Sequence, residues 1–102
     1  MLVQIVRFKS RLSGEAVQGM YEARAPQYRA LPGLLQKYYL QFPATQEHGA
    51  VLVWQSEEAL TEFEESELAR TIPSAYEAQG EPEKTVGKVV MTLRPEASSV
   101  RT

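Results

Sequence analysis

The sequence predicts a single α+β domain whose elements follow in the order strand, helix, strand, strand, helix, strand. Four short segments rich in β-branched and aromatic residues are separated by two segments whose apolar residues recur at helical spacing. The second and third of the short segments are joined by a brief polar stretch, which is typical of an antiparallel hairpin. The length of 102 residues allows one domain with one hydrophobic core.

Composition excludes several classes of site. The chain has no cysteine and no aspartate, so disulfides, thiolate metal sites, Ser-His-Asp triads and aspartate-based metal loops are excluded in their usual forms. The single histidine, His48, rules out an intrachain site made of several histidines. The glutamates of residues 57–67 are interpreted as a solvated helix face, and no glycine belongs to a phosphate-binding motif. We therefore expect no cofactor and no metal.

The charge pattern and the N-terminus bear on partners and location. The net charge is −2, and no segment carries a dense basic patch, so nucleic acid is not an expected partner. No apolar run approaches the roughly 20 residues of a membrane helix, and the N-terminal segment reads as a strand and not as a signal peptide. These features predict a cytoplasmic protein without a membrane partner.

The first strand is predicted over residues 2–9, where both side-chain parities are apolar. Ser13 is the expected N-cap of a helix that runs to about Ala30, with Glu15 in its first turn. Pro26 falls on the side opposite the apolar stripe and is expected to kink the helix around the core. The stripe that faces the core is predicted to contain Val17, Met20, Tyr21, Tyr28 and Leu31.

The second half begins with a predicted hairpin: a strand over 34–42, a polar turn over 43–49 and a strand over 50–55. Ser56 is the expected N-cap of the second helix, which is predicted to break near Ser66. Pro73 is predicted to stop the second helical piece, and one more turn is expected over 74–79. The last strand is predicted over 84–94, so the domain spans residues 1–94 and residues 95–102 form a flexible C-terminal tail.

This order is the split βαβ, or ferredoxin-like, arrangement, in which two helices cover one face of a four-stranded antiparallel sheet. Each predicted strand has apolar residues of both parities, for example Leu2 and Val3, or Leu52 and Val53. A second apolar face on a chain of this size needs a partner. The sequence therefore predicts a homodimer in which two sheets pack face to face.

A resemblance to a known family rests mainly on residues 32–63. The segments that carry it are Pro32-Gly33-Leu34-Leu35, Lys37-Tyr38-Tyr39, Glu47-His48-Gly49-Ala50 and Val53-Trp54-Gln55-Ser56-Glu57-Glu58-Ala59-Leu60. They resemble the YdhR-like monooxygenases of the dimeric α+β barrel superfamily, which are related to the antibiotic biosynthesis monooxygenases. The resemblance implies an oxidoreductase that acts on a small aromatic or polyphenolic molecule with O₂ and no cofactor.

Three residues are candidate catalytic groups. Arg24 falls within the apolar stripe of the first helix, where it would hold an anionic oxygen of a substrate, pair with a glutamate, or extend its guanidinium to solvent. Trp54 ends the third strand and would offer its indole N–H to a substrate oxygen or simply fill the core. His48, placed in the hairpin turn, is the one standard general-base candidate, although a turn histidine is usually solvated.

Tyrosines are the candidate substrate-binding residues. Tyr21, Tyr28 and Tyr39 are expected to supply phenolic donors to a pocket between the helices and the sheet, or to pack in the core or the dimer interface. Two alternatives to an oxygenase remain open. One is a non-catalytic or stress-associated dimer that binds a small ligand, and the other is a haem protein in which His48 is the axial ligand.

Overall fold

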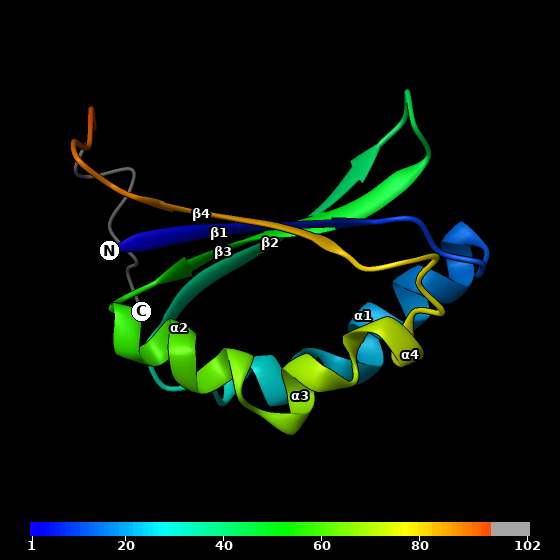
Figure 1. Ribbon diagram of the computed structural model, residues 1–102, viewed down its shortest axis with the longest axis horizontal. Helices are drawn as coiled ribbons and strands as arrows, with labels where there is room; N and C mark the ends of the chain where they lie inside the picture. Colours follow the sequence, from blue (N-terminus) through cyan, green and yellow to red (C-terminus); the bar gives the residue numbers. More distant parts are fainter. Residues whose placement is uncertain (95–102) are drawn as a thin grey trace.

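The computed structural model describes residues 1–94 and has the predicted α+β architecture (Figure 1). One four-stranded antiparallel sheet has the strand order β2-β3-β1-β4, and all the helices lie on one of its faces. The elements are β1 (Leu2–Phe8), α1 (Gly14–Arg29), β2 (Leu34–Phe42), β3 (Glu47–Trp54), α2 (Glu57–Glu64), α3 (Glu67–Arg70), α4 (Ile72–Ala75) and β4 (Glu83–Lys88). This is the ferredoxin-like order predicted from the sequence.

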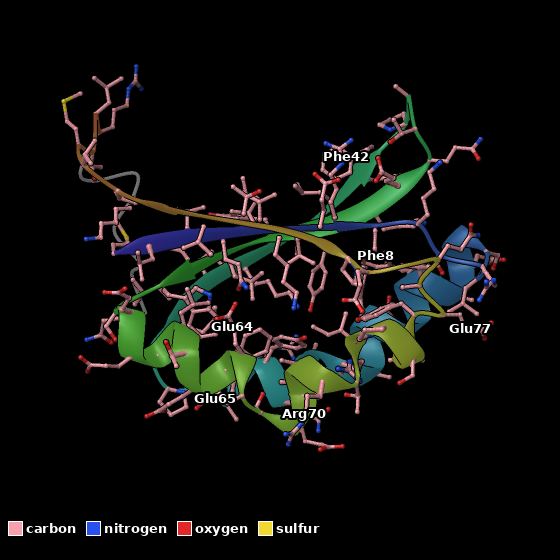
Figure 2. The ribbon with its side chains drawn as sticks, in the orientation of Figure 1. Phe8, Phe42, Glu64, Glu65, Arg70 and Glu77 are labelled. Carbon is pink, nitrogen blue, oxygen red and sulfur yellow. The ribbon has the colours of Figure 1, made fainter. Side chains whose placement is uncertain are left out.

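The inner face of the sheet packs against the helices. In β1, Leu2, Gln4, Val6 and Phe8 are all buried, which is the period-two pattern of a strand with one covered face. Phe8 points toward the helices, whereas Phe42 lies on the opposite face of the sheet (Figure 2). The main core cluster joins this face to helices α1, α2 and α3 and contains Leu2, Val6, Tyr28, Ala50, Leu52, Trp54, Leu60, Phe63 and Ala69.

Serine side chains start the first three helices, as the sequence predicts. Ser13 Oγ accepts a hydrogen bond from the Ala16 backbone N–H at 3.1 Å, and Ser56 and Ser66 make the equivalent contacts at the starts of α2 and α3. These caps satisfy backbone donors that have no partner inside the helix. The break of the second helix at Ser66 is therefore a local property of the sequence, confirmed in the structure.

The hairpin differs from its prediction. The turn occupies only residues 43–46, because Gln46 adopts a left-handed conformation with φ of 59° and its N–H donates to the Phe42 carbonyl at 2.8 Å. Strand β3 therefore begins at Glu47 and not at Ala50. The prediction that His48 lies in the turn was wrong: His48 is a strand residue paired with Phe8 on one side and Gln41 on the other.

The C-terminal half differs in two further ways. Pro73 does not stop a helix but occupies the first turn of α4, where its missing N–H costs nothing. Strand β4 ends at Lys88 and not at residue 94: Lys88 pairs with Leu2, the first residue of β1, and one further backbone hydrogen bond joins the Val89 N–H to the Met1 carbonyl at 3.0 Å. Among the residues that follow, Val90 is 93% exposed and Leu93 is 80% exposed. The predicted tail lies outside the described residues.

The outer face of the sheet is apolar in its middle. Ile5 on β1 lies opposite Val51 on β3, which in turn lies opposite Tyr38 on β2. In the single chain Ile5 is 39% exposed and Tyr38 is 57% exposed. The helices all cover the other face, so the structure contains the uncovered apolar surface that the strand parities predict. Within residues 1–94, no helix is long and apolar enough to cross a membrane.

Gly49 is required where β1 and β3 approach each other. A Cβ at this position would collide with the Val6 carbonyl oxygen and press on the Phe42 ring. We expect Gly49→Ala to lower the free energy of unfolding by about 2 kcal/mol or more, because a buried backbone contact cannot yield. Gly19→Ala on the exposed side of α1, where a Cβ meets nothing, should instead raise it by about 0.5–1 kcal/mol. Urea denaturation of both variants checks this, and equal effects of the two would contradict the packing described.

Candidate functional site

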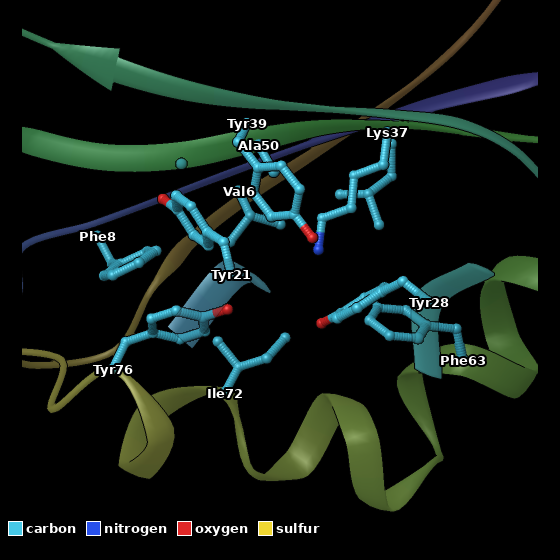
Figure 3. Close-up of a pocket in the computed structure, with 12 residues that line it drawn as sticks. Val6, Phe8, Tyr21, Tyr28, Lys37, Tyr39, Ala50, Phe63, Ile72 and Tyr76 are labelled. Carbon is cyan, nitrogen blue, oxygen red and sulfur yellow. The ribbon is translucent and has the colours of Figure 1, made fainter. Parts of the chain in front are cut away.

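A cavity lies between the inner face of the sheet and the helices (Figure 3). It is lined by Val6, Phe8, Tyr21, Tyr28, Lys37, Tyr39, Gly49, Ala50, Leu52, Phe63, Ile72 and Tyr76. The lining is aliphatic and aromatic except for phenolic hydroxyls and one amine, that of Lys37. The cavity volume is about 30 Å³, which is room for about two water molecules.

A bulge in β2 directs Lys37 into this cavity. The pairing of β2 with β3 shifts register between Leu34 and Gln36, so Leu35 is an extra residue. Beyond the bulge, Lys37 and Tyr39 fall on the inner face, opposite Leu52 and Ala50, while Tyr38 falls on the outer face.

The Lys37 amine is surrounded by aromatic rings and has no acidic partner. Its Nζ lies 3.2 Å from the ring centroid of Tyr28 and 4.5 Å from that of Tyr39. No carboxylate lines the cavity, and Nζ makes no hydrogen bond or ion pair within residues 1–94. Burial, and secondarily the positive charge of Arg24, lower the pKa of Lys37 to about 7. The π faces favour the ammonium and oppose this shift without cancelling it.

Four tyrosines line the cavity, namely Tyr21, Tyr28, Tyr39 and Tyr76. Tyr21 and Tyr39 stack with ring centroids 4.1 Å apart, and Tyr21 also lies 5.5 Å from Tyr76. The hydroxyl of Tyr21 is buried and has no hydrogen-bond partner. Burial raises the pKa of Tyr21 to about 12 and raises that of Tyr76 above its ordinary value. These phenols therefore stay protonated near neutral pH and act as hydrogen-bond donors and not as bases.

Arg24 supplies a second positive charge behind the cavity wall. Its Nη2 donates to the Leu68 carbonyl at 2.7 Å and to Thr71 Oγ1 at 3.2 Å, so the guanidinium ties α1 to α3. Its Nε is buried without a partner. Burial raises the pKa of Tyr28, and the hydrogen bond and charge of Arg24 oppose that rise. Arg24 thus has no glutamate partner, and one of its donors remains unused.

The other two candidate catalytic residues do not line the cavity. Trp54 is 0% exposed, its indole N–H donates to Gln4 Oε1 at 3.1 Å, and its ring packs 5.2 Å from that of Phe63. His48 lies on β3 with its ring centroid 6.0 Å from that of Phe8. The structure thus brings together Tyr21, Tyr28 and Tyr39 and places Arg24 beside them, while Trp54 fills the core.

Tyr39 is common to the cavity and to two depressions on the surface. Two open depressions of about 330 Å³ each lie on either side of it along α1 and β2, and Tyr39 lines both of them as well as the cavity. His48 and Tyr21 line one depression, and Lys37 and Tyr28 line the other. Turning the Tyr39 ring aside would join the three spaces.

Sequence reasoning missed Lys37 and Tyr76 as site residues. The available signal for Lys37 was its parity, because it alternates with Tyr39 along the strand. A charged residue on the same side as a predicted pocket tyrosine is a candidate for that pocket. Tyr76 gave no local signal, because it caps a single helical turn whose position depends on tertiary packing.

Known structures share this fold. Over 90% of the chain, the structure matches SnoaB, a cofactor-independent oxygenase from Streptomyces nogalater, with a TM-score of 0.73, 14% identity and 95% of that chain covered. A protein described as an antibiotic biosynthesis monooxygenase matches over 89% of this chain and 100% of its own, with a TM-score of 0.69 and 14% identity. A variant of MhuD with two manganese protoporphyrin IX molecules bound per active site matches over 92% and 99%, with a TM-score of 0.71 and 18% identity. No protein-family model and no curated protein sequence matches the chain. These matches show that this chain has the same ferredoxin-like fold as the proteins named above.

The buried amine makes stability depend on pH. Between about pH 7 and about pH 10, the unfolded chain keeps the Lys37 proton that the native protein has lost, so the free energy of unfolding should rise with pH. Above about pH 10 it should fall, because tyrosines ionise in the unfolded chain before Tyr21 does in the native one.

In Lys37→Met, the rise between about pH 7 and about pH 10 should shrink by an amount on the order of 1–2 kcal/mol. Lys84→Met, which alters an exposed lysine on β4, is the matched control and should retain the rise. Urea denaturation across the pH range measures both. Parallel profiles for wild type and Lys37→Met would show that Lys37 titrates normally.

Proposed function

We propose that this protein is a cofactor-independent monooxygenase, of the YdhR-like kind that its sequence resembles, which oxidises a small aromatic or polyphenolic molecule in the cavity between sheet and helices. The observation that carries the proposal is the composition of this cavity. Its wall is aromatic and aliphatic, and the charges in and beside it, those of Lys37 and Arg24, are both positive. Such a site favours an apolar molecule that becomes an anion.

An activated polyphenol can reduce O₂ without a cofactor. A substrate such as an anthrone loses a proton and becomes an electron-rich enolate that transfers electrons directly to O₂. The ring carbon that carried two hydrogens becomes a carbonyl, one oxygen atom of O₂ enters the product and the other leaves as water. The substrate supplies all four electrons, so no external reductant is required.

The protein then has three tasks, and the cavity is suited to each. Aromatic rings such as those of Tyr28 and Phe63 hold a planar substrate and exclude water. Phenolic hydroxyls that remain protonated donate hydrogen bonds to a substrate oxygen. The unused Nε donor and the charge of Arg24 stabilise the anion that forms when the substrate loses its proton.

The shared fold supports the proposal by analogy. SnoaB, named as a cofactor-independent oxygenase, has the same arrangement of sheet and helices. Because one fold supports different chemistries, the proposed reaction rests on the composition of the cavity and not on the fold.

The same fold also includes a porphyrin-binding protein, MhuD. The site described here lacks the axial ligand on which the haem alternative depends. His48, the one histidine, does not line the cavity. We derive no step that passes through haem.

We also propose that the protein is a homodimer built sheet on sheet, the quaternary arrangement of a dimeric α+β barrel. The apolar outer face around Ile5, Val51 and Tyr38 is uncovered in one chain. The segment after β4, which carries Val90, Met91 and Leu93, extends past the end of the sheet with its side chains exposed (Figure 1). Joining two such faces by a two-fold axis would bury both features.

Oxygen consumption tests the enzymatic proposal. We expect the protein to consume O₂ with a reduced quinol or an anthrone, and Arg24→Ala to slow the reaction by about tenfold or more, because a donor to the developing anion is lost. Arg70→Ala, which removes an exposed arginine of α3 outside the site, is the matched control and should retain the activity. Thermal stabilisation by the same compounds without O₂ uptake would favour the non-catalytic ligand-binding alternative.

Light scattering coupled to size-exclusion chromatography tests the dimer. The wild type should elute at twice the mass of the 11.5 kDa chain, and Tyr38→Glu should produce a folded monomer because it places a charge in the apolar interface. Gln27→Glu, on the exposed side of α1, should stay dimeric. A wild-type protein that elutes at the mass of one chain would refute the sheet-on-sheet arrangement.

A further inference from the structure

The Lys37 ammonium has no counter-ion in this cavity within residues 1–94. A buried cation needs a counter-ion or must give up its proton. Within the described residues no carboxylate lines the cavity, and the positive charge of Arg24 disfavours the ammonium. Two ring faces, those of Tyr28 and Tyr39, are the remaining source of stabilisation. The resting amine therefore loses its proton more readily than a solvated lysine.

The groups around the amine come from every element that packs against it. Helix α1 supplies Arg24, Tyr21 and Tyr28, strand β2 supplies Tyr39, and the end of α4 supplies Tyr76. Strands β1 and β3 contribute apolar side chains and backbone to the lining, and α2 contributes Phe63. Glu64 of α2 is bound instead by Gln4, whose Nε2 donates to it at 3.5 Å. Within the described part of the chain, the amine is thus the one base that lines the cavity.

We propose that Lys37 accepts the proton of a weakly acidic phenol or enol that enters this cavity, and that the resulting anion pairs with the Lys37 ammonium, while the positive charge of Arg24 behind the cavity wall adds to its stabilisation. In this step the O–H bond of the ligand breaks and an N–H bond forms at Nζ. No electron is transferred and no further reactant is required. Lys37 would touch the reacting oxygen and would be a catalytic residue in an oxidation that begins with loss of this proton.

The cavity favours a neutral acid over a preformed anion as the entering species. A neutral phenol enters an apolar space without the cost of removing water from a charge. Once inside, the phenol gives its proton to the Lys37 amine. The ammonium and the phenolate that form then stabilise each other. A carboxylic acid is already ionised in water near neutral pH, so it arrives as an anion and has no proton to give.

We expect entry to involve movement of Tyr39. The resting cavity of about 30 Å³ does not admit a ring, but Tyr39 is 36% exposed and lines both the cavity and the two surface depressions. Removing this side chain would join the spaces and leave Lys37 in place. Tyr39→Ala is therefore the variant in which binding can be measured even if the wild type admits the ligand slowly.

The probe for the test is 4-nitrophenol, whose phenolate absorbs visible light and whose neutral form does not. The complex holds one proton shared between amine and phenol, so affinity should be greatest between the pKa of Lys37, about 7, and that of the probe, and should fall on both sides. The bound probe should have the phenolate spectrum even below neutral pH. These results are expected for the wild type or, if entry is slow, for Tyr39→Ala.

Two variants of Lys37 distinguish its role as a proton acceptor from the effect of its positive charge. Lys37→Met should weaken binding at neutral pH by about tenfold or more and should remove the phenolate spectrum of the bound probe at low pH. Lys37→Arg keeps the charge but accepts no proton, so it should bind only the preformed phenolate, with an affinity that rises with pH to a plateau. Lys84→Met on β4 should behave as the wild type does.

The inference rests on the proposed site but not on its oxygen chemistry, since the readouts are a spectrum and a binding profile. Phenolate binding with the expected pH profile but without O₂ uptake would refute the oxygenase and leave the role of Lys37 intact. The inference is overturned if neither the wild type nor Tyr39→Ala binds the probe, if the bound probe keeps its neutral spectrum, or if Lys37→Met and wild type have the same profile. Tighter binding of benzoate than of 4-nitrophenol below neutral pH would also overturn it, because it would identify a site for preformed carboxylates.

Discussion

A lysine placed inside an aromatic cavity without a counter-ion is the constraint on which the site depends. The sheet and helices of this protein could enclose an ordinary apolar core. Instead, Lys37 extends from β2 into the space between them and contacts the ring of Tyr28. Desolvation penalises its charged form, and the guanidinium of Arg24 adds to the penalty. The interior of the domain is therefore electrostatically favourable for an anion.

The chemistry of the groups around Lys37 suits the binding of such an anion. Tyrosines provide hydrogen-bond donors that remain neutral, so they satisfy an incoming oxygen without competing for the proton. Arg24 is fixed by the Leu68 carbonyl and Thr71, which leaves Nε available and orients the guanidinium before any ligand arrives. Preorganised donors of this kind cost no rearrangement when charge develops. Trp54, by contrast, donates its indole N–H to Gln4 and stabilises the core.

Local chemistry made much of the fold predictable. Ser13, Ser56 and Ser66 mark helix starts because their side chains bond backbone groups only three residues away, and Tyr21 and Tyr28 share a face because of helical period. Features set by distant residues were not predictable in the same way. The limit of β4 at Lys88 depends on where β1 begins, and the place of His48 depends on the left-handed conformation of Gln46. Lys37 faces inward beyond a bulge in the pairing of β2 with β3, and strand alternation alone does not say which parity faces the helices.

The most direct measurement of the central claim is an NMR titration of the Lys37 side chain, assigned by its loss in Lys37→Met. In the free protein its carbon next to Nζ should titrate near pH 7, and the titration should move to higher pH when 4-nitrophenol saturates the site, because the ammonium then has its anion. Titration near the ordinary lysine value of 10.5 in the free protein, unchanged by the ligand, would contradict the account.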